Sequence, residues 1–217
     1  MKTLAFAVLV TLAAVKAFAA ITDSTCIGTL HGVALDEKNH PVPGVTVMLD
    51  PIGVDLSYLL PTTVTNEAGV YRFDHVCSGR FTVVVDDVRA GYPPHYWSYL
   101  LGRREVKFNK KTHDIELPVL VPPKAASLSL TVRDRRTTSS LAAFDVMFNT
   151  TKSKRHDWLT IKQDSAEQLL VPANTELLFR VAATGYREWP KGKKAGKPIR
   201  LVPDSQTSLS VELEPLH

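Results

Sequence analysis

The sequence predicts an all-β protein made of two tandem β-sandwiches. Runs rich in Val, Ile, Leu, Thr and aromatic residues are separated by Pro, Gly, Asn and Asp, which is the pattern of short strands joined by turns. In residues 45–47 and 71–73, apolar side chains recur at every second position, as in strands with one buried face. No stretch shows a helical period. With 217 residues, 44% hydrophobic and 22% charged, the chain can bury a sizeable core, so a disordered or fibrous protein is excluded.

The first half contains a series of predicted strands separated by turn residues. Pro41, Pro43 and Gly44 mark the first turn, because proline fixes φ and glycine tolerates a tight reversal. Asn66–Gly69 forms a short hairpin loop that ends in glycine. The predicted strands are residues 25–35, 45–49, 62–65, 70–75, 81–85 and 115–120.

Prolines mark the predicted boundary between the two sandwiches. Pro118, Pro122 and Pro123 bracket a short stiff segment. The charge changes at the same place: residues 21–121 hold 9 Lys and Arg against 12 Asp and Glu, whereas residues 122–217 hold 15 against 10. Both halves begin with an alternating strand, later reach a strand followed by Gly-Tyr, and close on a strand followed by proline. We therefore expect two copies of one sandwich, over residues 21–121 and 122–217.

The N-terminus predicts a cleaved signal peptide over residues 1–20. Lys2 supplies the positive charge, residues 4–15 an apolar run, and Ala17-Phe18-Ala19 the small-x-small cleavage pattern. The apolar run is shorter than the roughly 20 residues that span a bilayer. No later stretch is apolar enough for a membrane anchor, so no transmembrane segment is expected in the mature chain. A buried N-terminal helix is the alternative. The expected location is secreted or periplasmic.

Cys26 and Cys77 are the only two cysteines. In an exported protein such a pair most simply forms one structural disulfide, and two free thiols are the alternative.

The first half resembles the carboxypeptidase regulatory-like domain. The resemblance rests on the spaced motifs of residues 32–49, 65–73 and 76–83, together with Gly91-Tyr92; Asn66 and Cys77-Ser78 depart from the family pattern at turns. It implies a transthyretin-like sandwich of seven strands that serves as an accessory module and carries no catalytic residues. The second half resembles a divergent copy through residues 170–179 and Gly185-Tyr186.

No residue pattern predicts catalysis, a metal or a cofactor. His113 and Glu116 have a metal-ligand spacing, but positions three apart on a strand face opposite sides of the sheet. A nucleophile elbow and a phosphate-binding glycine loop are both missing from the sequence. We therefore expect a protein that is not an enzyme, with an unrecognised hydrolase as the least favoured alternative.

Four aromatic residues predict a binding loop. Tyr92, Tyr96, Trp97 and Tyr99 crowd one short segment, where exposed rings could anchor a protein partner or stack on a glycan. The alternative is that these rings plug a sandwich or bury the interface between the modules.

Basic runs at residues 152–155 and 191–197 lack interleaved aromatic residues, so we interpret them as solvated loops and expect no nucleic-acid partner. The sequence thus favours an exported binding or structural module for an unknown protein, with carbohydrate binding as the alternative.

Overall fold

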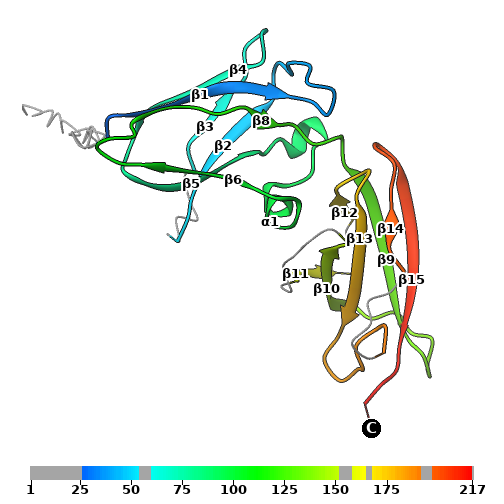
Figure 1. Ribbon diagram of the computed structural model, residues 1–217. Coiled ribbons are helices and arrows are strands. Elements are labelled where there is room, and N and C mark those ends of the chain that lie inside the picture. Colours follow the sequence, from blue (N-terminus) through cyan, green and yellow to red (C-terminus); the bar gives the residue numbers. More distant parts are fainter. Residues whose placement is uncertain (1–25, 54–59, 152–157, 165–167, 192–196, 217) are drawn as a thin grey trace, which may run out of the picture.

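Two β-sandwiches joined end to end with a bend make up the protein (Figure 1). The structure, a computed structural model, describes residues 26–53, 60–151, 158–164, 168–191 and 197–216. The predicted all-β fold with two tandem sandwiches is confirmed. The predicted signal peptide lies outside the described residues.

The first sandwich packs two sheets against each other. In one sheet, β1 pairs with β4 on one side and with β7 and β8, both parallel to β1, on the other. The second sheet has the order β3-β2-β5-β6 and is antiparallel throughout. The strands are β1 (Gly28–Leu35), β2 (Thr46–Pro51), β3 (Thr62–Val64), β4 (Val70–Val76), β5 (Gly79–Val85), β6 (Arg104–Phe108), β7 (Asp114–Glu116) and β8 (Val119–Leu120).

The second sandwich repeats this arrangement. One sheet has the order β12-β9-β15, with β15 parallel to β9, and the other has the order β11-β10-β13-β14. The strands are β9 (Ala126–Asp134), β10 (Ala143–Thr150), β11 (Leu159–Asp164), β12 (Gln168–Val171), β13 (Glu176–Ala182), β14 (Ile199–Arg200) and β15 (Gln206–Leu213).

The two sandwiches have the same topology when β7 and β8 are counted as one interrupted strand. The strands β1 to β6 then correspond in order to β9 to β14, and β7 with β8 corresponds to β15. The Gly-Tyr pair follows β5 in one copy and β13 in the other, and both glycines, Gly91 and Gly185, have a φ of 83°. This left-handed backbone is favourable for glycine and strained for other residues, so the repeated Gly-Tyr marks the same turn twice.

The interruption between β7 and β8 differs from the continuous strand predicted over residues 115–120. The carbonyl oxygen of Leu117, which lies between the two strands, accepts a 2.6 Å hydrogen bond from the buried Tyr71 hydroxyl. Gly32 on β1 makes room for this carbonyl, because a Cβ at Gly32 would lie 1.9 Å from the Leu117 oxygen.

A disulfide joins Cys26, just before β1, to Cys77 in the turn between β4 and β5. The predicted pairing is confirmed.

Two hydrophobic clusters form the cores, one in each sandwich. Alternate residues of the strands supply them, as in β1 and β9, where buried side chains alternate with half-buried or exposed ones. The second cluster also contains two residues that the chain supplies from the first half, Trp97 and Leu100.

Candidate functional site

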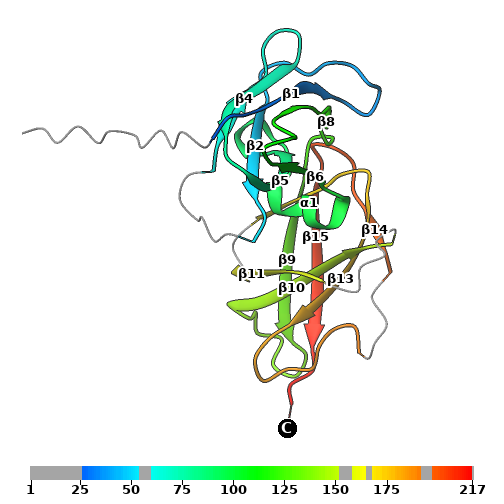
Figure 2. The ribbon, with the colours of Figure 1, turned by 60° about the vertical axis from the view of Figure 1, so that its left-hand side comes forward.

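The connection between β5 and β6 reaches from the first sandwich into the second. It contains the short helical turns η1 (Val88–Ala90) and η2 (His95–Trp97) and the single-turn helix α1 (Ser98–Leu101). Gly102, with a φ of 94°, ends α1 and turns the chain into β6. Figures 1 and 2 both show α1 between the two sandwiches.

Trp97 fills part of the second core. Its side chain is 1% exposed, and its ring centroid lies 5.0 Å from that of Phe148 on β10. The indole Nε1–H donates a 2.9 Å hydrogen bond to the Leu170 carbonyl on β12. Because a buried indole needs both apolar packing and a partner for its N–H, these contacts fix the first sandwich on the second.

The other predicted aromatic residues lie at different depths. Tyr92 is 8% exposed in the first core, with the Lys124 ammonium 3.6 Å from its ring centroid. Tyr96 and Tyr99 are half-buried and pack against the second core. For Trp97, the structure agrees with the alternative that the ring is buried at the interface between the modules. Ligand binding stays a prediction, and the accessible rings for it are Tyr96 and Tyr99.

An ion pair holds the start of η2. His95 Nδ1 lies 3.3 Å from Asp86 Oδ1, and the His95 backbone N–H donates to the same oxygen at 3.2 Å. The side-chain contact with Asp86 raises the pKa of His95 against the opposing effect of burial. The same contact, together with the backbone hydrogen bond, holds the pKa of Asp86 below its ordinary value, again against burial. The pair therefore fixes His95, two positions before Trp97, on the first sandwich.

Hydrogen bonds to backbone carbonyls hold the short link from β8 to β9 in place. The N–H of Ala125 donates a 2.8 Å hydrogen bond to the Gly91 carbonyl, and Lys124 Nζ donates to the carbonyl of Ala90. Asp204, just before β15, donates its N–H to Ala125 at 3.0 Å. The link is thereby tied to both sandwiches.

A cleft of about 870 Å³ opens at this junction. Both sandwiches line it, so its shape depends on the contacts of Trp97 and of the β8–β9 link. Its lining is mixed, with apolar, hydroxyl and charged side chains. The lining includes Tyr99, Leu101, Arg103, Glu105, Leu120, Thr151, Asn174, Glu176 and Arg200.

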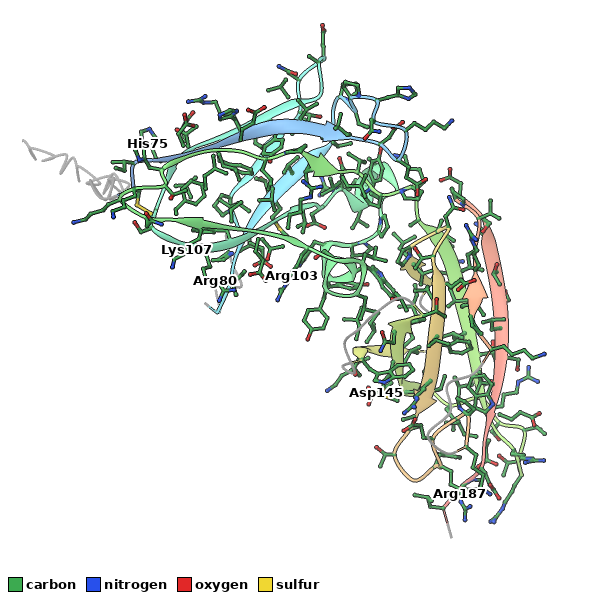
Figure 3. The ribbon with its side chains drawn as sticks, viewed as in Figure 1. His75, Arg80, Arg103, Lys107, Asp145 and Arg187 are labelled. Atoms are coloured by element: carbon green, nitrogen blue, oxygen red, sulfur yellow. A yellow bond between two sulfur atoms is a disulfide. The ribbon has the colours of Figure 1, made fainter. Side chains whose placement is uncertain are left out.

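One wall of the cleft carries a small charged network. Glu105 Oε2 lies 2.7 Å from Arg80 Nη2, and Glu105 Oε1 lies 3.6 Å from Arg103 Nε. The Arg103 guanidinium lies 5.4 Å from the ring centroid of Tyr99, within range of a cation–π contact. Figure 3 shows Arg80, Arg103 and Lys107 on the side of the first sandwich that faces the open angle of the bend.

The opposite wall comes from the second sandwich. Thr151 Oγ1 donates a 2.8 Å hydrogen bond to Glu176 Oε2 at the start of β13, and Arg200 of β14 also lines the cleft. The cleft thus offers donors, acceptors, both signs of charge and an aromatic ring. Such a lining suits a polar chain with hydrogen-bonding groups more than a small apolar ligand.

The described residues contain no group of three or more His, Cys, Asp or Glu side chains that could hold a metal ion. His113 and Glu116, which share a metal-ligand spacing, are both exposed at β7. No described helix is long and apolar enough to cross a membrane. The basic run at residues 152–155 lies outside the described residues, as does most of the run at residues 191–197.

The charged residues of the cleft carry no signal in the sequence. Arg103 and Glu176 are far apart along the chain, and neither stands in a pattern that predicts a binding site. They line one cleft because the β5–β6 connection packs on the second sandwich.

No protein-family model matches the chain, and no curated protein matches it in sequence. Among solved structures, the chain is similar to the TIE protein of Bacillus anthracis, with a TM-score of 0.35 and 14% identity over 88% of this chain and 34% of that protein. A streptococcal ancillary pilin matches with a TM-score of 0.32 and 15% identity over 89% of this chain and 63% of the pilin. The shaft pilin SpaA of Lactobacillus rhamnosus GG matches with a TM-score of 0.33 and 11% identity over 88% and 98% of the two chains.

The chain thus spans about a third of the length of the first of these structures and 63% of the second. TM-scores this low do not define a common fold, so the description as two sandwiches depends on the sheets themselves.

Proposed function

We propose that this protein is an exported, non-enzymatic module for protein interaction or cell-envelope scaffolding. Its two units would span residues 21–121 and 122–217, each a transthyretin-like sandwich of the kind that the motifs of residues 32–49 and 65–73 resemble. The Cys26–Cys77 disulfide supports export, because disulfides persist in oxidising compartments.

The observation that carries this proposal is the insertion of Trp97 into the second core. Tandem modules on a flexible linker move independently, whereas a buried tryptophan with a satisfied N–H holds two modules at one angle. A fixed angle is useful to a protein that spaces or orients its partners, and it keeps the cleft open without a ligand.

The cleft is the proposed contact site for the partner. Leu120 is 59% exposed at its rim, and Leu101 is 39% exposed, so apolar anchors lie beside the charged residues. Interfaces commonly combine a few apolar or aromatic anchors with a polar rim. A segment of a protein partner is therefore the favoured occupant.

Site-specific photo-crosslinking in the cell envelope tests this proposal. A photoreactive amino acid at Leu120 should give a defined adduct, and one at Val64 should give none. Val64 is a matched control because it is 61% exposed and lies on β3, at the opposite edge of the sheet from β6. Charge reversal at Arg103 and Arg200 should remove the adduct at Leu120. Equal adducts at both positions, or an adduct that survives the reversal, would contradict the proposal.

Carbohydrate binding is the second candidate, because Tyr99 lines the same cleft as Glu105 and Asn174. An aromatic face with nearby carboxylate and amide groups suits a sugar ring. On a glycan array, wild-type protein should then give signals that Tyr99→Ala removes. An array without signals would leave the protein-interaction proposal as the only candidate.

A further inference from the structure

The outer edge of β15 is an open strand edge in the second sandwich. Within the described part of the chain, β15 pairs only with β9, in register over all eight of its residues. The carbonyl of Ser205 accepts from Ser127, and that of Leu213 accepts from Arg135, so odd-numbered residues direct their backbone groups toward β9. The even-numbered residues direct theirs outward, and all four are exposed: Gln206, Ser208, Ser210 and Glu212.

The same position in the first sandwich is protected. There the edge is divided into β7, of three residues, and β8, of two, with Pro118 between them and with Asp114 and Glu116 as charged residues. Short strands, proline and charge are the usual means by which proteins keep strand edges from pairing. β15 has none of these features apart from Glu212, because its sequence is QTSLSVEL.

The remaining edges of the described sheets are also short, charged or distorted. β3 has three residues, β14 two and β12 four. β6 carries Arg104, Glu105 and Lys107, and β11 carries Lys162. The pairing of β4 with β1 changes register between Gly28 and Leu30 of β1, and His75 on β4 has a φ of 59°. β15 is therefore the one long and regular edge among the described strands.

We propose that β15 pairs antiparallel with β15 of a second copy of this chain. A two-fold axis beside Leu209 would place Ser208 opposite Ser210 of the other copy and Gln206 opposite Glu212. All four are outward-facing residues, so each pair exchanges both backbone hydrogen bonds, and the pairing gains about eight of them. A typical protein interface has about ten direct hydrogen bonds.

Charge complementarity favours a second copy as the occupant. In this register each Glu212 carboxylate faces a Gln206 amide, which can donate to it. The two Glu212 side chains lie six residues apart along the ribbon, about 20 Å, which exceeds the Debye length of about 8 Å at physiological ionic strength. The central pairs are small serine hydroxyls, so the strands can approach without steric or electrostatic cost.

Among the described residues, the edge is accessible from Gln206 to Glu212, and it ends where the Arg187 N–H donates to the Glu214 carbonyl. A notch of about 440 Å³ borders its C-terminal half, lined by Trp189, Arg135 and residues 210–212. Figure 1 shows β15 along the side of the second sandwich that faces away from α1, so the pairing leaves the cleft free.

Paired charge variants test the dimer and its register. Ser208→Lys with Ser210→Lys places two lysines opposite each other in both central pairs, and Ser208→Glu with Ser210→Glu does the same with carboxylates. Each variant should be monomeric in sedimentation equilibrium, under conditions where the wild type shows a concentration-dependent dimer. An equimolar mixture of the two variants should recover the dimer, because unlike charges then face each other.

A proline variant tests the backbone contribution. The Ser208 N–H points away from β9, so Ser208→Pro removes a hydrogen bond of the dimer and none of the β9 ladder. It should weaken dimerisation at least tenfold while the monomer keeps its thermal transition. A wild type that stays monomeric to millimolar concentration would overturn the proposal, as would lysine and glutamate variants whose mixture does not dimerise. A separate peptide of another sequence that pairs with β15 while the wild type stays monomeric would also overturn it.

Discussion

Trp97 lies within the core of the second sandwich, where its indole Nε1–H donates a 2.9 Å hydrogen bond to the carbonyl oxygen of Leu170. The residue precedes α1 in the connection between two strands of the first sandwich. Trp97 is therefore part of the chain of the first sandwich, but its side chain stabilises the core of the second.

Trp97→Ala should lower the free energy of unfolding of the second sandwich by about 3–5 kcal/mol, because it removes a large buried ring and leaves a cavity. Trp97→Phe keeps much of the packing but orphans the Leu170 carbonyl, at a cost of about 1–3 kcal/mol. Urea denaturation followed by circular dichroism measures both. Leu101→Ala is the control, since Leu101 lies on the same segment and is 39% exposed. Equal losses for Trp97→Ala and Leu101→Ala would show that Trp97 does not join the sandwiches.

The pair of His95 and Asp86 should give the junction a pH dependence. The pKa of His95 is raised from 6.5, so its contribution is complete below pH 6.5 and is lost as the pH rises through the higher folded pKa. The pKa of Asp86 is lowered from 3.8, so its contribution is present above pH 3.8 and is lost as the pH falls through the lower folded pKa. The pair is therefore most stabilising between these two ordinary values.

His95→Gln should remove this pH dependence at a cost of about 0.5–1 kcal/mol near pH 5, a value reduced by solvent screening because the His95 side chain is 39% exposed. The measurement is the free energy of unfolding of wild type, His95→Gln, Asp86→Asn and the double variant at several pH values. A coupling energy of zero at pH 5 would refute the role of the pair.

Loss of the disulfide should destabilise the first sandwich. Cys26 and Cys77 are 51 residues apart in sequence, and a cross-link of this span contributes about 2–4 kcal/mol. The Cys26→Ser, Cys77→Ser double variant and the reduced wild type should lose the same amount in urea denaturation. A stable wild type that reacts with a thiol reagent before reduction would contradict the bond.

Gly32→Ala should be strongly destabilising although Gly32 lies in an ordinary strand. The added methyl group would meet the backbone carbonyl of Leu117, which Tyr71 also holds through its hydroxyl. Because that carbonyl cannot move freely, we expect a loss of about 3 kcal/mol, at the upper end of the usual cost of overpacking. Gly79→Ala is the control, since its Cβ would meet only the Phe81 ring at 3.2 Å. Thermal melts of the two variants that coincide would contradict the tight fit.

Much of the fold could be predicted from the sequence, because strand patterns and turn residues are local. The alternation in residues 71–73 lies in β4, and Gly91-Tyr92 and Gly185-Tyr186 mark the same turn in both copies. The break between β7 and β8 could not be predicted. It depends on a hydrogen bond from Tyr71, which the chain brings to Leu117 only in the folded sheet.

The aromatic segment shows the same division. Its composition predicted either a binding loop or a buried interface. A row of aromatic residues has the same sequence pattern in both cases. The depth of each ring is decided by which surface packs on it, and for Trp97 that surface comes from Phe148 and Leu170.

By itself, the sequence determined the strands, their turns, the duplication and the cysteine pair, since each depends on residues close in the chain or on their number. The tertiary structure alone decided that the β5–β6 connection crosses to the other sandwich, that Arg103 and Glu176 share one cleft, and that β15, among the described strands, pairs on one side only. The physical reason is that burial and strand pairing depend on which surfaces come together in space. Residues on two such surfaces are distant in the chain, and no local sequence pattern predicts their contact.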